Sequence, residues 1–132
     1  MTITLARCFV QVNDADLALD FYRDALGLEV RNDVAKDDLR WITLGSPDQP
    51  DVSIILTNYL SGSPEDHDVV SALIAKGGFS GVHFQTDDLD ATFVKLRDAG
   101  VEIVQEPTDQ PWGARDGAVR DPSGNFVRID QV

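Results

Sequence analysis

The sequence has few of the residues that would link it to an oxidising compartment, to nucleic acid or to a membrane. Its single cysteine, Cys8, excludes an intrachain disulfide, so we expect a reducing, cytoplasmic location. The 23 Asp and Glu residues outnumber the 11 Lys and Arg residues, and a net charge of -12 disfavours nucleic acid, whose backbone needs clustered cations. No apolar run approaches the roughly 20 residues of a membrane-spanning helix, and the first residues lack the pattern of a secretory signal.

The residues that are present fit one small globular domain. A chain of 132 residues has the size of a single domain, so we expect one domain over residues 1–132. Cys8 alternates with Val10 and Val12, and we expect it to be buried with them. The acidic balance would attract a cationic small molecule, although acidity also favours solubility alone.

One pattern occurs twice in the chain. Residues 5–30 and 80–103 each begin with an apolar strand and pass through an acidic cap into an amphipathic helix, which leads to a second strand. In our alignment Leu17 corresponds to Leu89, and Phe21 to Phe93. A repeat at this scale indicates a duplicated module. Because each copy is too short to bury a core alone, the two should pack together and enclose a groove in which function is to be sought.

Periodicity and turn residues extend each half to a βαβββ pattern. The expected strands are 5–12, 28–33, 39–44 and 52–59 in the first half, and 81–86, 102–106, 114–120 and 125–130 in the second. The expected helices are 14–26 and 89–99, with a linker helix within 63–77. The predicted fold class is α+β, with paired βαβββ modules (3–60 and 80–132) forming a curved mixed sheet around a groove.

Three segments link this pattern to a known family. They are VNDADLALDFYRDALGLEV at the first helix, VRDPSGNFVRID near the end, and the longer DQPWGARDGAVRDPSGNFVRI that contains it. The chain resembles the vicinal oxygen chelate superfamily over nearly its whole length. This superfamily holds glyoxalase I, extradiol dioxygenases, fosfomycin-modifying enzymes and bleomycin-resistance proteins, and the longest segment is similar to bleomycin-binding members. The resemblance implies a homodimer, but one fold hosts several chemistries.

The resemblance also implies where a metal would bind. Metal-dependent members take their ligands, typically His, Glu, His and Glu or Gln, from the first and last strands of each copy. The corresponding residues here are Arg7, Ile55, Gly81 and Arg128. None supplies the carboxylate, imidazole or thiolate that a divalent metal requires. We therefore expect no metal and no other cofactor, and no chemistry that depends on a metal Lewis acid.

Aromatic and polar residues at groove-facing positions favour a binding site for a planar molecule, because flat rings stack on planar ligands. The expected ligand-binding residues are Arg7, Phe9, Gln11, Trp41, Ile55, Tyr59, His83, Gln85, Trp112, Phe126 and Arg128. Arg7 and Arg128 suit a carboxylate, phenolate or carbonyl of a ligand, or else each pairs with a carboxylate of the chain, such as Asp130. Trp112 either stacks on the ligand or anchors its loop against a neighbouring subunit.

We therefore predict a metal-free protein that sequesters a planar aromatic antibiotic or metabolite, as bleomycin-resistance proteins do. The alternative is a glyoxalase-like lyase or isomerase, or a dioxygenase-like enzyme, with an atypical site in which His83 acts as the base. A third interpretation is an assembly or regulatory module with a vestigial groove. The expected partners are a small aromatic ligand and a second copy of the chain, not nucleic acid or a membrane.

Overall fold

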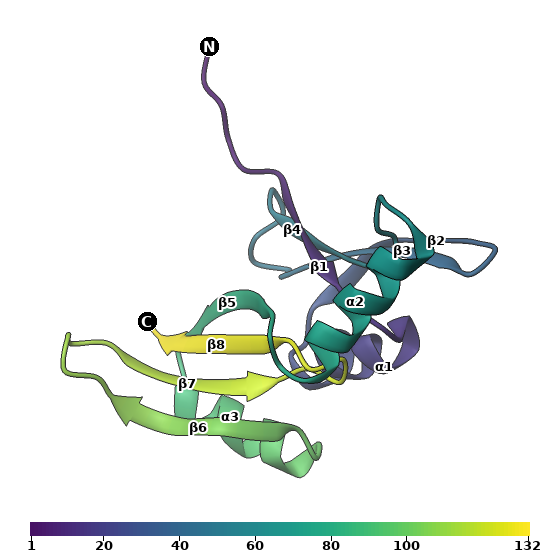
Figure 1. Cartoon of the computed structure of the whole chain (residues 1–132). Helices are drawn as coiled ribbons and strands as arrows, with labels where there is room; N and C mark the ends of the chain where they lie inside the picture. Colours follow the sequence, from purple (N-terminus) through teal and green to yellow (C-terminus); the bar gives the residue numbers. More distant parts are fainter.

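The computed structural model describes all 132 residues as two lobes, each built on a four-stranded sheet (Figure 1). The first lobe contains β1 (Arg7–Gln11), α1 (Ala15–Leu19), η1 (Asp20–Ala25), β2 (Glu29–Lys36), β3 (Leu39–Gly45) and β4 (Ser53–Thr57). The second contains β5 (Ser80–Thr86), α3 (Leu89–Asp98), β6 (Glu102–Asp109), β7 (Arg115–Arg120) and β8 (Phe126–Gln131), and α2 (Pro64–Ala75) connects the lobes. The predicted α+β class and the paired modules are confirmed.

The two sheets have the same topology. Their strand orders are β1-β4-β3-β2 and β5-β8-β7-β6. In each sheet the first strand runs parallel to the last, and the remaining neighbours are antiparallel. The edge strands β1 and β5 contact each other, so the open edge of one sheet lies beside the open edge of the other.

Short polar residues begin each helix, as the sequence predicts. Asp14 and Asp88 cap α1 and α3 by accepting a hydrogen bond from a backbone N–H three residues later. Ser63 and Asp66 form a reciprocal capping box at α2. The first helix differs from the prediction, because after Leu19 it continues as a π-helix, and the apolar pattern over two turns does not distinguish the wider spacing. No helix is long and apolar enough to cross a membrane.

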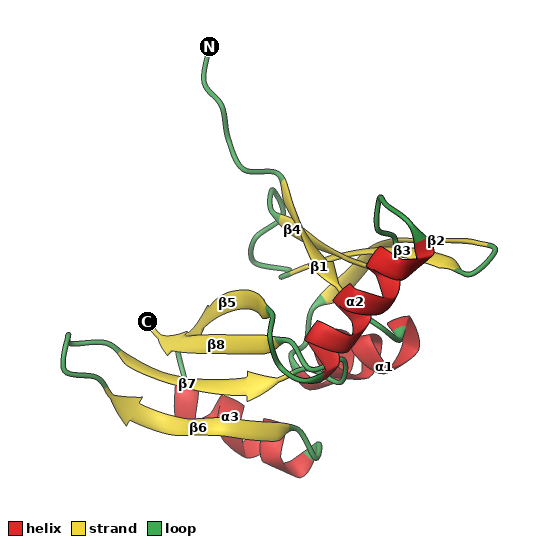
Figure 2. Cartoon of the chain, in the orientation of Figure 1, coloured by secondary structure: helices red, strands yellow, loops and turns green.

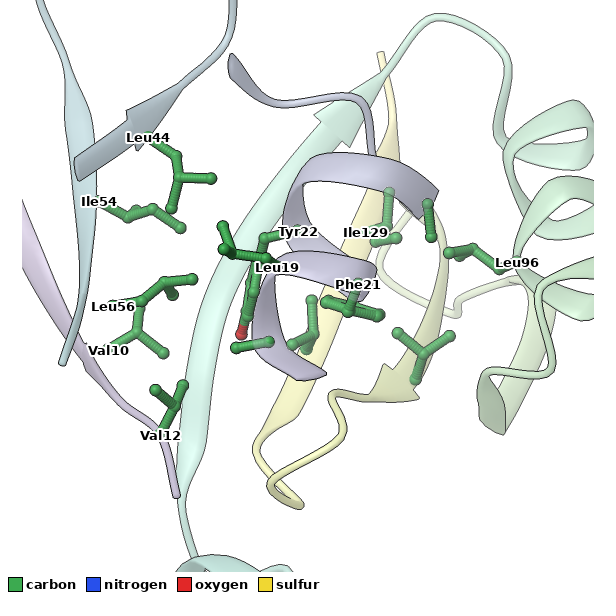
Figure 3. Packing of buried hydrophobic residues seen from close by; sticks show 14 of the residues in the cluster. Val10, Val12, Leu19, Phe21, Tyr22, Leu44, Ile54, Leu56, Leu96 and Ile129 are labelled. Carbon is green, nitrogen blue, oxygen red and sulfur yellow. The ribbon is translucent and has the colours of Figure 1, made fainter. Parts of the chain in front are cut away.

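One hydrophobic core joins the lobes. It contains 17 buried residues from both modules. In Figure 3 the helix carrying Leu19, Phe21 and Tyr22 lies between the strand residues of the first lobe and Ile129 and Leu96 of the second. The Tyr22 hydroxyl donates a 2.7 Å hydrogen bond to Asp121, which lies in the turn between β7 and β8. The first helix therefore packs on its own sheet and also anchors the hairpin of the other module.

One expectation about burial and one about the alignment of the two modules are wrong. Cys8 is exposed, because it lies near the start of β1, outside the part of the strand covered by the core that buries Val10 and Val12. Leu17 is 50% exposed whereas Leu89 is buried, so these two residues are not equivalent. The helix caps provide a better alignment of the two modules: counted from Asp14 and Asp88, Leu19 corresponds to Phe93 and Tyr22 to Leu96, and all four are buried.

Candidate functional site

Each sheet has one face that contributes to the core and one face that helices leave open (Figure 2). Side chains alternate between the two faces along a strand, so the residues next to core positions lie on the open side. The first open face comprises Arg7, Phe9, Gln11, Trp41, Thr43, Ile55 and Thr57. The second open face comprises His83, Gln85, Asp116, Ala118, Phe126, Arg128 and Asp130. Both contain residues that the sequence analysis selected.

The centre of the first open face is aromatic and apolar, and polar residues surround it. The rings of Phe9 and Trp41 meet edge to face, with centroids 5.0 Å apart and an interplanar angle of 79°. Ile55, the strand partner of Phe9, is only 3% exposed, so it supports this face and offers little surface to a ligand. Phe9 is 61% exposed, an unusual state for such a ring. Arg7, beside it on β1, is exposed and forms no ion pair.

The end of the first open face is held by Arg31, which the sequence analysis did not select. Its guanidinium donates to the carbonyls of Val52, Ser46 and Gln49 and to the Ser53 hydroxyl. It lies over Gly45, where an added Cβ would come within 2.4 Å of the arginine Nη1. Arg31 therefore fixes the loop before β4 and is a structural cation.

Beyond β4, Tyr59 continues the first open face. Its carbonyl accepts a 2.8 Å hydrogen bond from the Gln11 amide, and 47% of the residue is exposed. Gln11 thus holds the segment that carries Tyr59 beside β1.

The second open face is polar and charged. Arg128 donates a 2.9 Å hydrogen bond to Asp116, a carboxylate that is 3% exposed and that also accepts a 2.7 Å bond from Gln110. The guanidinium also lies 5.3 Å from the centre of the Phe126 ring. Arg128 therefore pairs with a carboxylate of the chain, as one of the two interpretations held, but its partner is Asp116 and not Asp130.

Asp130 lies instead beside His83. The two are 2.9 Å apart, from imidazole Nε2 to carboxylate Oδ1. The imidazole is 58% exposed, whereas the Oδ1 atom is buried and has no hydrogen bond of normal geometry. The acid next to His83 went unnoticed in the sequence because parallel pairing, which brings β5 beside β8, is a long-range contact.

Trp112 lies in the loop between β6 and β7, which is closed by a 2.7 Å hydrogen bond from Gln110 N–H to the Ala114 carbonyl. It is 72% exposed, and Gln85 on β5 is also exposed. Stacking on a ligand and packing on a second subunit both remain predictions for this ring.

Neither open face is enclosed by the chain itself, as the exposure of Phe9 and Tyr59 on the first and of His83 on the second shows. A cleft of about 750 Å³ lies elsewhere, between the ends of α2 and α3 and the turn 121–124. A smaller one of about 190 Å³ lies beside His67 and includes Gln11. The predicted groove therefore needs a further wall.

The residues at the four positions that bind the metal in metal-dependent members do not come together as a metal site in this structure. Arg7 is exposed, Ile55 is buried and Arg128 is bonded to Asp116. No group of three or more His, Cys, Asp or Glu side chains in the chain is placed to hold a metal ion. That the protein works without a metal or another cofactor stays a prediction.

Comparison with known proteins agrees with this architecture. UcmS2, whose crystal structure is known, is 35% identical, covers 100% of both chains and superposes with a TM-score of 0.88. TnmS3, an antibiotic binding protein from Streptomyces sp. CB03234, is 27% identical with a TM-score of 0.75 and covers 99% of this chain and 98% of its own. A probable lactoylglutathione lyase of Synechocystis sp. is 25% identical over 97% of this chain and 95% of its own. Residues 4–129 match the family model, so the chain belongs to the Glyoxalase/Bleomycin resistance protein/Dioxygenase superfamily.

Proposed function

We propose that the protein binds a planar, partly hydrophobic small molecule, such as an aromatic antibiotic or metabolite, and releases it unchanged. The observation that carries the proposal is the exposed aromatic surface of the first open face, where the Phe9 and Trp41 rings meet. Apolar area combined with a few orienting polar groups is the usual composition of a small-molecule site. The similarity to TnmS3, an antibiotic binding protein, supports an antibiotic as the ligand.

The composition of the family's catalytic positions supports binding without turnover. The four positions that bind the metal in metal-dependent members offer no metal ligand here; they are Arg7, Ile55, Gly81 and Arg128. A reaction that depends on a metal-polarised oxygen is therefore not supported by these residues. Among the polar groups of the open faces, none is a serine or cysteine paired with a base. We infer that the groove retains its ligand and does not convert it.

The missing wall of the groove belongs, in this proposal, to a second copy of the chain. A homodimer would cover the exposed Phe9, Tyr59 and Trp112, and two-fold pairing provides two equivalent grooves. Sedimentation equilibrium at micromolar concentration should therefore report twice the 14.5 kDa of one chain. A species of 14.5 kDa would contradict this part of the proposal. The exposed single cysteine is compatible with the cytoplasmic location that we propose.

A lyase or isomerase of the glyoxalase kind is the second candidate. Two observations favour it: His83 lies 2.9 Å from the carboxylate of Asp130, an arrangement that orients a base, and the chain is 25% identical to a probable lactoylglutathione lyase. This candidate predicts turnover of a hemithioacetal that disappears in His83→Gln.

The deciding experiment is a screen of planar aromatic compounds, including antibiotics, by tryptophan fluorescence and thermal shift. Compounds that bind are then incubated with the protein, extracted and analysed by mass spectrometry. We expect saturable binding and an unchanged mass. A chemically altered compound would overturn the sequestration proposal and favour the enzyme.

A further inference from the structure

The second open face carries two carboxylates that differ in how they are neutralised. Asp116 is bonded to Arg128 and Gln110. Asp130, its partner across β7 and β8, has no arginine or lysine partner, and its close neighbour is the imidazole of His83. The polar groups on this face, His83 and Gln85 on β5, Asp116 on β7, and Arg128 and Asp130 on β8, therefore balance in charge only when His83 is protonated.

A proton on His83 would stabilise the Asp130 carboxylate, because of where this carboxylate lies. Its Oδ1 atom is buried and lacks a hydrogen bond of normal geometry, although it is 2.9 Å from His83 Nε2. A buried carboxylate oxygen without a donor is unfavourable. A cationic imidazole would stabilise it through charge as well as through the N–H group.

The second ring nitrogen of His83 is available to a ligand. Nε2 faces Asp130, Nδ1 makes no hydrogen bond within the chain, and the side chain is 58% exposed on the proposed groove. When the neutral ring carries its proton on Nε2, the nitrogen nearer the carboxylate, Nδ1 has a lone pair and accepts a hydrogen bond.

We propose that His83 and Asp130 form a proton-accepting subsite that selects ligands carrying an acidic hydroxyl group, a phenol or an enol, on a planar ring. On binding, the ligand O–H bond breaks and an Nδ1–H bond forms. The resulting imidazolium pairs with Asp130 through Nε2 and holds the ligand oxyanion through Nδ1. The proton stays within the complex, and no other reactant is needed. This inference rests on the proposed function and specifies the class of ligand.

A matched pair of probes tests the subsite. 7-Hydroxycoumarin and 7-methoxycoumarin have the same planar ring system, but the ether has no proton to transfer. The absorbance of the hydroxy compound also distinguishes its phenol from its phenolate. In the wild-type protein we expect the hydroxy compound to bind about tenfold more tightly than the ether, as a hydrogen bond between charged groups allows, and to show the phenolate spectrum when bound.

Three variants locate the proton acceptor. In His83→Gln, the glutamine amide has donors for Asp130 but cannot take up a proton, so we expect both probes to bind equally and the phenolate spectrum to be lost while the fold is kept. Asp130→Asn should also lose the phenolate spectrum, because the imidazolium no longer has an anionic partner. His67→Gln is the control, since His67 lies on α2, outside the second open face, and bonds to the Leu60 carbonyl; it should behave as wild type.

The outcomes separate the two proposals. Equal affinity of the two probes for the wild-type protein overturns the subsite and leaves the binding function intact. A phenolate spectrum that persists in His83→Gln also overturns the subsite, because another group then takes the proton. Failure of both probes to bind the wild-type protein overturns both.

Discussion

The two lobes have the same strand order and the same helix position, yet the centres of their open faces differ in charge. Strand pairing assigns equivalent positions in the two sheets, occupied by Phe9 and His83, by Ile55 and Arg128, by Trp41 and Asp116, and by Thr57 and Asp130. At all four positions an uncharged residue of the first lobe is replaced by a charged or ionisable one. The repeated architecture therefore provides one wall suited to an apolar ring and one suited to polar groups.

The helix sides of the lobes are, by contrast, closely matched. Asp14 and Asp88 cap the helices in the same way. One residue pair ties the first turn of the helix to the start of the third strand in each lobe: Asp16 with Arg40 in the first, at 3.1 Å, and Asp90 with Arg115 in the second, at 2.8 Å. Folding constrains the side of each sheet that builds the core, whereas the open side is not needed for the core and is available for function.

The substitutions with the largest expected effect on the free energy of unfolding remove core side chains from equivalent positions of the two lobes. Phe93 and Leu19 are both buried, and Phe93 packs so closely on Gly117 that an added Cβ there would come within 2.4 Å of the ring. We expect Phe93→Ala to lower the free energy of unfolding by about 3–5 kcal/mol and Leu19→Ala by about 2–5 kcal/mol, because each leaves a cavity. Urea denaturation monitored by circular dichroism measures both.

The control for these core variants is Phe9→Ala on the open side, measured at a concentration low enough to favour monomers. It should cost less than either core substitution, since the ring is already largely exposed. A loss as large as that of Phe93→Ala would mean that the open face contributes to the fold and would break the comparison.

Ligand binding should depend on exposed rings in both lobes, Phe9 in the first and Trp112 in the second. Replacing Trp112 with Ala should weaken binding of a planar probe such as 7-methoxycoumarin by about 1–3 kcal/mol, the range for burying a large side chain, while leaving the urea midpoint unchanged. Equilibrium dialysis of this variant and of Phe9→Ala assigns the affinity to one wall or to both. If Trp112→Ala binds as wild type but sediments as a monomer, the ring anchors the subunit contact instead.

Tyr22 is one position where the helix sides differ, because its equivalent, Leu96, has no hydroxyl to reach the other lobe. Tyr22→Phe removes the hydrogen bond to Asp121, whose same oxygen keeps a bond from Asn125. We expect a loss of roughly 1–2 kcal/mol in the free energy of unfolding. Leu96→Met, which removes no hydrogen bond, is the matched control and should cost less.

The environment of Tyr22 also predicts that the free energy of unfolding depends on pH. Burial, and then the charge of Asp121 and its hydrogen bond, raise the pKa of the Tyr22 phenol well above 10.0. A raised pKa in the folded state favours the neutral phenol, so the contribution is complete below pH 10 and declines as pH rises above that value. Wild-type stability should therefore fall more steeply than that of Tyr22→Phe in urea denaturation between about pH 9 and pH 11. If the stabilities of the two proteins fall in parallel as pH rises, the pH dependence does not come from Tyr22.

The smallest expected effects come from the two equivalent ion pairs. Arg40→Ala and Arg115→Ala each remove a surface bridge between a helix and a strand, together with a pair to Asp33 or to Asp109, and such exposed pairs contribute little. Both should lower the thermal midpoint slightly at low ionic strength, and molar salt should reduce the difference from wild type. If the two variants differ strongly from each other, the lobes are less equivalent than their geometry indicates.

Much of the fold follows from local patterns, because alternation and caps act within a few residues. The strand positions and helix caps agree with the prediction, while β2 and β6 extend further, to Lys36 and Asp109. Antiparallel partners in the sheet allow such extension beyond the apolar segment. The π-helix at Asp20–Ala25 was missed because two apolar turns fit more than one helical spacing.

For the candidate site, the sequence predicts which face a residue occupies but not what covers or neutralises it. Alternation along β1 and β8 places Phe9 and Arg128 away from the core, as expected. The pairing of Arg128 with Asp116, the contact of His83 with Asp130 and the exposure of Cys8 follow from strand register and from where the core ends. By itself the sequence determined the duplicated modules, their caps and the two sides of each sheet, since these depend on neighbours within a few residues. Only the tertiary structure decided which charges meet and which rings stay uncovered, because those contacts join strands that lie far apart in the chain.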